Sequence, residues 1–65
     1  MRKISRQRGM AMLDNGGVMQ GLTWEGPFAY LVIREAPRPD ATAYLMHVSD
    51  DEAVSLGGRL NELAT

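Results

Sequence analysis

The sequence contains no cysteine and only one histidine, His47. Disulfide bonds and thiolate metal sites are therefore excluded, and a single histidine cannot build a zinc site from several imidazoles. A hydrolytic triad also needs a histidine beside its nucleophile. His47 is flanked by Met46 and Val48 in a segment typical of a strand, so we expect it to be structural. The sequence predicts a non-catalytic protein with no metal and no cofactor.

Long apolar runs are also missing. No run approaches the roughly 18 residues that span a bilayer. The basic N-terminus is not followed by the apolar segment of a secretory signal. Together with the lack of cysteine, these features favour a cytoplasmic protein that does not contact membranes.

The length of 65 residues leaves room for one domain. A domain this small buries only about 60% of the surface of its unfolded chain, so its own core provides little stability. Chains of this size usually gain stability from disulfides, a metal or a partner subunit. Because the first two are excluded, we expect a partner.

The charge is unevenly distributed along the chain. The net charge is −1, yet four of the seven Lys and Arg residues fall within residues 1–9, and all eight acids come later. Residues 1–9 show no clean periodicity and end at Gly9. We predict that they form a basic flexible arm, and that residues 10–65 form a single small α+β domain.

A first hairpin is predicted between Met10 and Met19. Asn15-Gly16 is the dipeptide preferred in type I′ turns, because both positions need positive φ. The second strand of this hairpin is expected to continue to Trp24, with Gly21 marking a bulge or bend.

A second hairpin follows the turn at residues 25–27. Residues 28–34 are rich in β-branched and aromatic side chains and predict a strand. A loop with two prolines is expected at residues 36–40, and a fourth strand at residues 42–48.

A helix is predicted to begin after Ser49. Ser49 and Glu52 have the spacing of a capping box. The following apolar residues recur at spacings of three and four and form one stripe: Ala53, Leu56, Leu60 and Leu63. The predicted fold is therefore α+β, a four-stranded antiparallel sheet of two hairpins followed by one C-terminal helix (ββββα).

Both faces of the predicted sheet are apolar. With a loop at residues 36–40, Val32 lies opposite Tyr44, and the alternation of side chains then places apolar residues on each face. One helix can cover only one face, and an exposed apolar face is normally a binding surface. The alternatives are that the strands curl into a half-barrel that buries both sets, or that the register differs.

These features predict a small protein-binding module, an inhibitor, adaptor or regulator, that acts as a homodimer or on a larger protein. Three methionines fall on one predicted face, and methionine adapts well to binding surfaces, although core filling also explains them. The size and composition also fit small accessory proteins of phages and mobile elements. The predicted partner-binding residues are Met10, Met12, Met19, Leu31, Ile33 and Leu45.

The alternative is a nucleic-acid-binding regulator that uses the basic arm. Its cations would contact phosphates and give salt-dependent binding. Protein binding should survive loss of the arm, whereas nucleic-acid binding should not. The residues of this alternative are Arg2, Lys3, Arg6 and Arg8.

Overall fold

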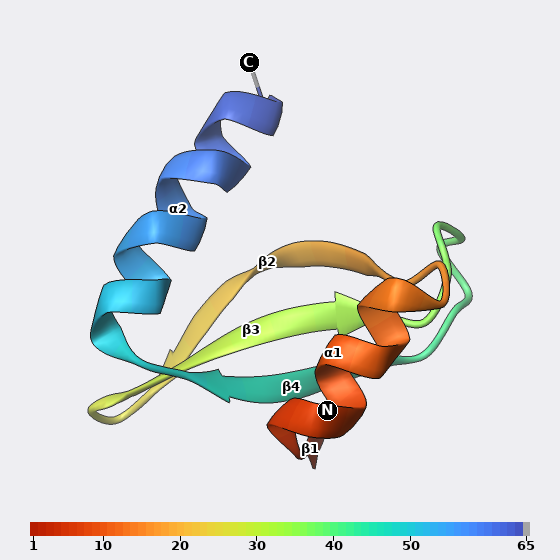
Figure 1. Ribbon diagram of the computed structural model, residues 1–65, viewed down its shortest axis with the longest axis horizontal. Coiled ribbons are helices and arrows are strands. Elements are labelled where there is room, and N and C mark those ends of the chain that lie inside the picture. Colours follow the sequence, from red (N-terminus) through yellow and green to blue (C-terminus); the bar gives the residue numbers. More distant parts are fainter. Residues whose placement is uncertain (65) are drawn as a thin grey trace.

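The protein folds as one mixed four-stranded sheet with two helices (Figure 1). The computed structural model describes the backbone of residues 1–64 and the side chains of residues 1–58. The sheet has the order β1-β4-β3-β2, in which β1 pairs with β4 in parallel and the other pairs are antiparallel. The elements are β1 (Arg2–Ile4), α1 (Arg6–Asp14), β2 (Val18–Glu25), β3 (Phe28–Arg34), β4 (Ala43–Val48) and α2 (Asp50–Ala64).

The α+β class is confirmed, but the predicted first hairpin is wrong. Residues 1–9 form β1 and the start of α1 where a flexible arm was expected, and residues 10–14 continue α1 where a strand was expected. The segment from Met10 to Leu13 consists of good helix formers. Ser5 caps the helix, because its Oγ accepts a hydrogen bond from the backbone N–H of Arg8 at 3.2 Å.

Asn15-Gly16 ends α1 and does not form a hairpin turn. Gly16 has φ 98°, and the N–H of Gly17 donates to the carbonyl of Met12 at 2.9 Å, which is the Schellman pattern of a helix C-terminus. The side-chain amide of Asn15 donates to the carbonyl of Ala11 at 2.8 Å. A type I′ turn and a helix C-terminus both use positive φ, so the dipeptide alone does not distinguish them.

The later elements follow the sequence prediction closely. The strand at residues 28–34 is confirmed, and the fourth strand begins one residue later than predicted. The irregularity predicted at Gly21 is a bulge, where the register with β3 shifts between Met19 and Gly21. Gly26 has φ 59° in the tight turn between β2 and β3.

The predicted register between β3 and β4 is wrong by one residue. Val32 pairs with Leu45 and not with Tyr44. The loop extends one residue further than predicted, since the N–H of Glu35 donates to the carbonyl of Thr42 at 2.9 Å. A slip of one residue moves every side chain of a strand to the opposite face. The side chains of β4 are therefore exchanged between the two predicted faces.

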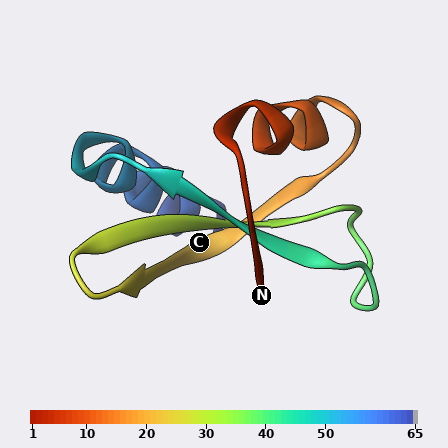
Figure 2. The same cartoon turned by 90° about the horizontal axis from the view of Figure 1, so that it is seen from below.

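Both helices pack on the same face of the sheet (Figure 2), which is called the helix side below. α1 contacts β3 and β4, whereas α2 contacts β2 and β3. Leu56 of α2 packs against the core, and the side chains of Leu60 and Leu63 lie outside the described residues. The buried core on the helix side consists of Ala29, Leu31, Ile33, Met46, Val48 and Ala53.

The capping box at the start of α2 is confirmed. Ser49 Oγ accepts from the N–H of Glu52 at 3.1 Å, and a carboxylate oxygen of Glu52 accepts from the N–H of Ser49 at 3.1 Å. Two backbone donors at the helix start are thereby satisfied, which fixes the point where the chain leaves β4.

The centre of the face opposite the helices is buried without a helix above it. Val32 and Leu45 lie there and are only 8% and 5% exposed. The loop between β3 and β4 bends toward this side (Figure 2), and the Arg34 guanidinium donates to the carbonyls of Pro39 and Ala41. Lys3 forms an ion pair with Glu25, which links edge strands β1 and β2 at 3.3 Å. The area around Val32 and Leu45 is therefore not an open apolar surface, and of the two alternatives the different register is the one observed.

Gly9 is the point where α1 approaches the sheet most closely. A Cβ at this position would overlap Met46 Sδ and lie 3.2 Å from Ile33 Cδ1, whereas a Cβ at Gly58 would meet nothing within 4 Å. We predict that Gly9→Ala lowers the free energy of unfolding by about 1–3 kcal/mol. Gly58→Ala should raise it by about 1 kcal/mol through helix propensity. Urea denaturation of both variants measures these changes. If the free energy of unfolding changes in the same direction in both, α1 does not pack closely on the sheet at Gly9.

Candidate functional site

The two helices leave part of the helix side uncovered between them. This cleft, of about 360 Å³, is the candidate site. β2, β3 and β4 provide its floor, and α1 and α2 form its walls. The lining residues are Arg6, Met10, Leu13, Met19, Leu31, Met46, Val48, Glu52, Ser55 and Leu56.

Most of the side chains that line the cleft are aliphatic or carry a thioether. Met10 is 46% exposed at the wall, and Met19 and Met46 lie on the floor. Methionine side chains adapt to partners of different shape because they are unbranched and polarizable. The volume lies at the lower end of the range for ligand pockets, about 300–1,000 Å³. The cleft therefore has room for a few apolar side chains of a partner, but not for a complete helix.

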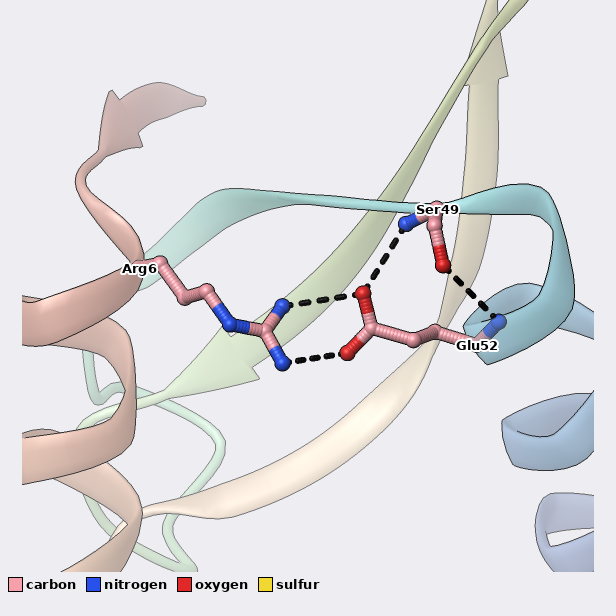
Figure 3. Close-up of polar contacts among 3 residues, drawn as sticks. All are labelled: Arg6, Ser49 and Glu52. Atoms are coloured by element: carbon pink, nitrogen blue, oxygen red, sulfur yellow. Dashed lines mark hydrogen bonds and ion pairs between the residues drawn. The ribbon is translucent and has the colours of Figure 1, made fainter.

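An ion pair links the two walls of the cleft. The Arg6 guanidinium of α1 donates two hydrogen bonds to the Glu52 carboxylate of α2, one of them at 3.0 Å (Figure 3). Glu52 also accepts from the N–H of Ser49, so the capping box holds the carboxylate toward Arg6. A bidentate pair of this kind fixes direction as well as distance. The cleft consequently has one charged rim and an apolar floor.

The ion pair shifts the acidity of both partners. The hydrogen bonds from Arg6, followed by the one from the Ser49 backbone, lower the pKa of Glu52 from 4.5 to about 2. The same interaction raises the pKa of Arg6. Both groups are therefore charged at any physiological pH.

The predicted partner-binding residues do not form one surface. Met10, Met19 and Leu31 lie together in the cleft, and Met12 packs against the core. Ile33 is fully buried beneath the helices. Leu45 lies on the opposite face because of the register of β4.

The sequence prediction missed several residues of the cleft. Leu13 lies three residues after Met10, a spacing that indicates one helix face. The sequence analysis assigned Leu56 only to the packing of the helix and Glu52 only to the capping box. The pairing of Glu52 with Arg6, 46 residues away, had no signal in the sequence.

The four basic residues of the nucleic-acid alternative are also separated. Lys3 pairs with Glu25 and lies 5.1 Å from the centre of the Tyr30 ring, and Arg6 pairs with Glu52. Arg2 and Arg8 are exposed. Two of the four cations are thus neutralised by carboxylates on different sides of the sheet.

An aromatic cluster lies on the face opposite the cleft. The His47 ring makes edge contacts with Phe28 and Tyr30, with centroid distances of 5.7 and 5.6 Å. Phe28 and His47 are exposed, whereas Tyr30 is half-buried. His47 therefore sits in a surface cluster of aromatic rings.

Comparison with known proteins adds no assignment: no protein-family model, no curated protein and no solved structure matches the chain. Among the described residues there is no group of three His, Cys, Asp or Glu side chains placed to hold a metal ion. No helix in the described part of the chain is long and apolar enough to cross a membrane. The function must be inferred from the cleft and the surfaces beside it.

The lowered pKa of Glu52 makes the contribution of the ion pair depend on pH. A carboxyl group whose pKa is lower in the folded state stabilises the fold above its unfolded pKa and loses this effect as pH falls. We predict that Glu52→Gln lowers the free energy of unfolding at pH 7, and that the deficit shrinks as pH falls from about 4.5 to about 2. Urea denaturation across this range measures it.

The matched control is Asp51→Asn, which removes a carboxylate from the same helical turn. Added salt should reduce the Glu52→Gln deficit more than the Asp51→Asn deficit, because salt screens the Arg6–Glu52 pair. Equal salt dependence of the two deficits would show that Glu52 does not act through Arg6.

Proposed function

We propose that the protein is a small non-catalytic protein-binding module, an inhibitor, adaptor or regulator, that acts as a homodimer or on a larger protein. Its binding surface is the cleft between α1 and α2. The observation that carries this proposal is an accessible, methionine-rich cleft directly above the core of a very small domain. Apolar surface of this kind on a small soluble fold is characteristic of interaction sites.

The chemistry of the cleft defines what it can accept. Its floor suits aliphatic or aromatic side chains, and the Arg6–Glu52 pair at the rim offers hydrogen-bonding groups of both signs. An amphipathic helix presents apolar anchors at spacings of three and four, and such anchors enter grooves of this type.

The energetics require an interface wider than the cleft. Each inserted apolar side chain contributes about 1.5–3 kcal/mol. Association costs about 4–15 kcal/mol in lost translational and rotational freedom. A few side chains in the cleft therefore support only weak binding, and neighbouring surfaces must also contact the partner.

A charge placed at the wall of the cleft tests the proposal. We predict that Met10→Lys abolishes binding to the partner, because the new ammonium would have to be desolvated in the interface. Affinity capture from the source cells together with light scattering of the purified protein provides the measurement, since the partner is either another protein or a second copy.

The matched control is Val54→Lys, which also replaces an exposed apolar residue on a helix. Val54 is 78% exposed and does not line the cleft. The Val54→Lys variant should capture the same proteins as the wild type and have the same oligomeric state. If Met10→Lys and Val54→Lys behave alike while both remain folded by circular dichroism, the cleft is not the binding surface.

Nucleic-acid binding is a second candidate, supported by the aromatic cluster of Phe28, Tyr30 and His47 beside Lys3. Exposed rings on a sheet can stack with bases of single strands. Under this candidate, a fluorescent single-stranded oligonucleotide binds in low salt, and Phe28→Ala weakens it severalfold. The measurement uses about 50 mM salt, because phosphate contacts are still strong at this salt concentration. Absence of binding there at about 50 µM protein would eliminate this candidate.

A further inference from the structure

The tip of the β2–β3 hairpin carries two large apolar side chains that are more than half exposed. Trp24 is 56% exposed and Phe28 is 53% exposed. Trp24 pairs with Ala29 of the buried core and therefore faces the helix side. Phe28 precedes Ala29 in β3, so it faces the opposite side. The tip thus presents one aromatic ring on each side, and neither ring lines the cleft.

The conformation of the tip is fixed by contacts within the chain. Gly26 has φ 59° in the turn, a value that favours glycine. The ion pair of 3.3 Å between Lys3 and Glu25 holds the last residue of β2. The His47 ring contacts Phe28 with a centroid distance of 5.7 Å. Because these contacts already exist, the tip loses less conformational entropy on binding than a flexible loop would lose.

The end of the molecule that holds the tip is acidic. The turn between β2 and β3 and the start of α2 lie at the same end of the sheet (Figure 1). Glu25 and Glu52 are each paired with a cation there, whereas Asp50 and Asp51 form no ion pair with a described residue. Both aspartates are exposed. They give the surroundings of the tip a negative charge, which attracts cations.

We propose that the hairpin tip is a docking surface for a basic, apolar segment of a partner protein, in which lysines or arginines alternate with aliphatic or aromatic residues. Trp24 and Phe28 would contact the apolar side chains on the two sides of the tip, and the aspartates of α2 would attract the cations. Aromatic anchors carry much of the binding energy of protein interfaces. Complementary charge accelerates the encounter and rejects partners of the wrong sign. This surface is separate from the cleft and goes beyond the function proposed for it.

A nucleic acid and a second copy of the chain fit the tip less well. The carboxylates of Asp50 and Asp51 repel phosphates, which dominate the affinity of proteins for nucleic acids. A two-fold contact brings identical patches together. A second copy would therefore place its own aspartates near those of the first, and like charges would oppose the contact.

Tryptophan fluorescence tests the proposal, because Trp24 is the only tryptophan of the chain. The probes are two synthetic peptides without tryptophan that share their leucine and phenylalanine positions. One peptide carries lysines between these positions, and the other carries glutamates. We expect the lysine peptide to shift the Trp24 emission and to bind at least about tenfold more tightly than the glutamate peptide, because like charges oppose binding. Added salt should reduce this difference.

Charge and anchor variants keep the tryptophan as the reporter. Asp50→Asn combined with Asp51→Asn should raise the dissociation constant of the lysine peptide severalfold, because the attracting charge is lost. The matched control combines Asp14→Asn with Asp40→Asn, two exposed aspartates in the end of α1 and in the loop between β3 and β4. These elements lie at the other end of the sheet (Figure 1), so the control should bind like the wild type. Phe28→Ala should raise the dissociation constant about tenfold, the scale of an interface anchor.

Three outcomes would overturn this inference. They are no shift of the Trp24 emission up to about 1 mM lysine peptide, equal affinities for the two peptides, or equal effects of the two aspartate pairs in variants that remain folded by circular dichroism. A larger shift with a single-stranded oligonucleotide would also overturn it, in favour of a nucleic acid. A lysine peptide that binds without shifting the Trp24 emission, and is lost with Met10→Lys, would remove this surface and leave the proposed function intact.

Discussion

The structure depends on keeping the centre of β3 away from water with only two short helices. Leu31 and Ile33 are almost completely buried, and they lie beneath helices that contact the sheet separately. The closest approaches are made by small residues, Gly9 in α1 and Ala53 in α2. The larger side chains flank the space between the helices and do not fill it. The cleft is therefore a direct result of how this core is covered.

The Arg6–Glu52 pair gives this arrangement a fixed geometry without contributing much stability. Both side chains are exposed, and ion pairs in water contribute little to the free energy of folding. The pair nevertheless joins the first turn of α1 to the first turn of α2, and the capping box orients its carboxylate. Preorganisation of the rim reduces the entropy that the Arg6 and Glu52 side chains would otherwise lose when a partner binds. An exposed ion pair can thus matter more for recognition than for stability.

Local patterns in the sequence predicted the elements whose signals are unambiguous. The β-branched run of residues 28–34 and the Ser49–Glu52 capping box are examples. The N-terminal half was mispredicted because Asn15-Gly16 suits two structures equally well. The register of β4 was mispredicted because the loop is one residue longer than expected and closes at Thr42. The cleft joins Arg6 to Glu52 and Met10 to Leu56, and such tertiary proximity has no local signal in one sequence.

The distribution of covered and uncovered surface explains why we propose the helix side as the binding surface. On the opposite face, Val32 and Leu45 are buried without a second layer of helices. What remains exposed on that face is the smaller aromatic cluster of Phe28 and His47. On the helix side, the cleft between α1 and α2 leaves apolar side chains accessible, among them Met10. A partner in the cleft would add apolar contacts to those that the chain already makes.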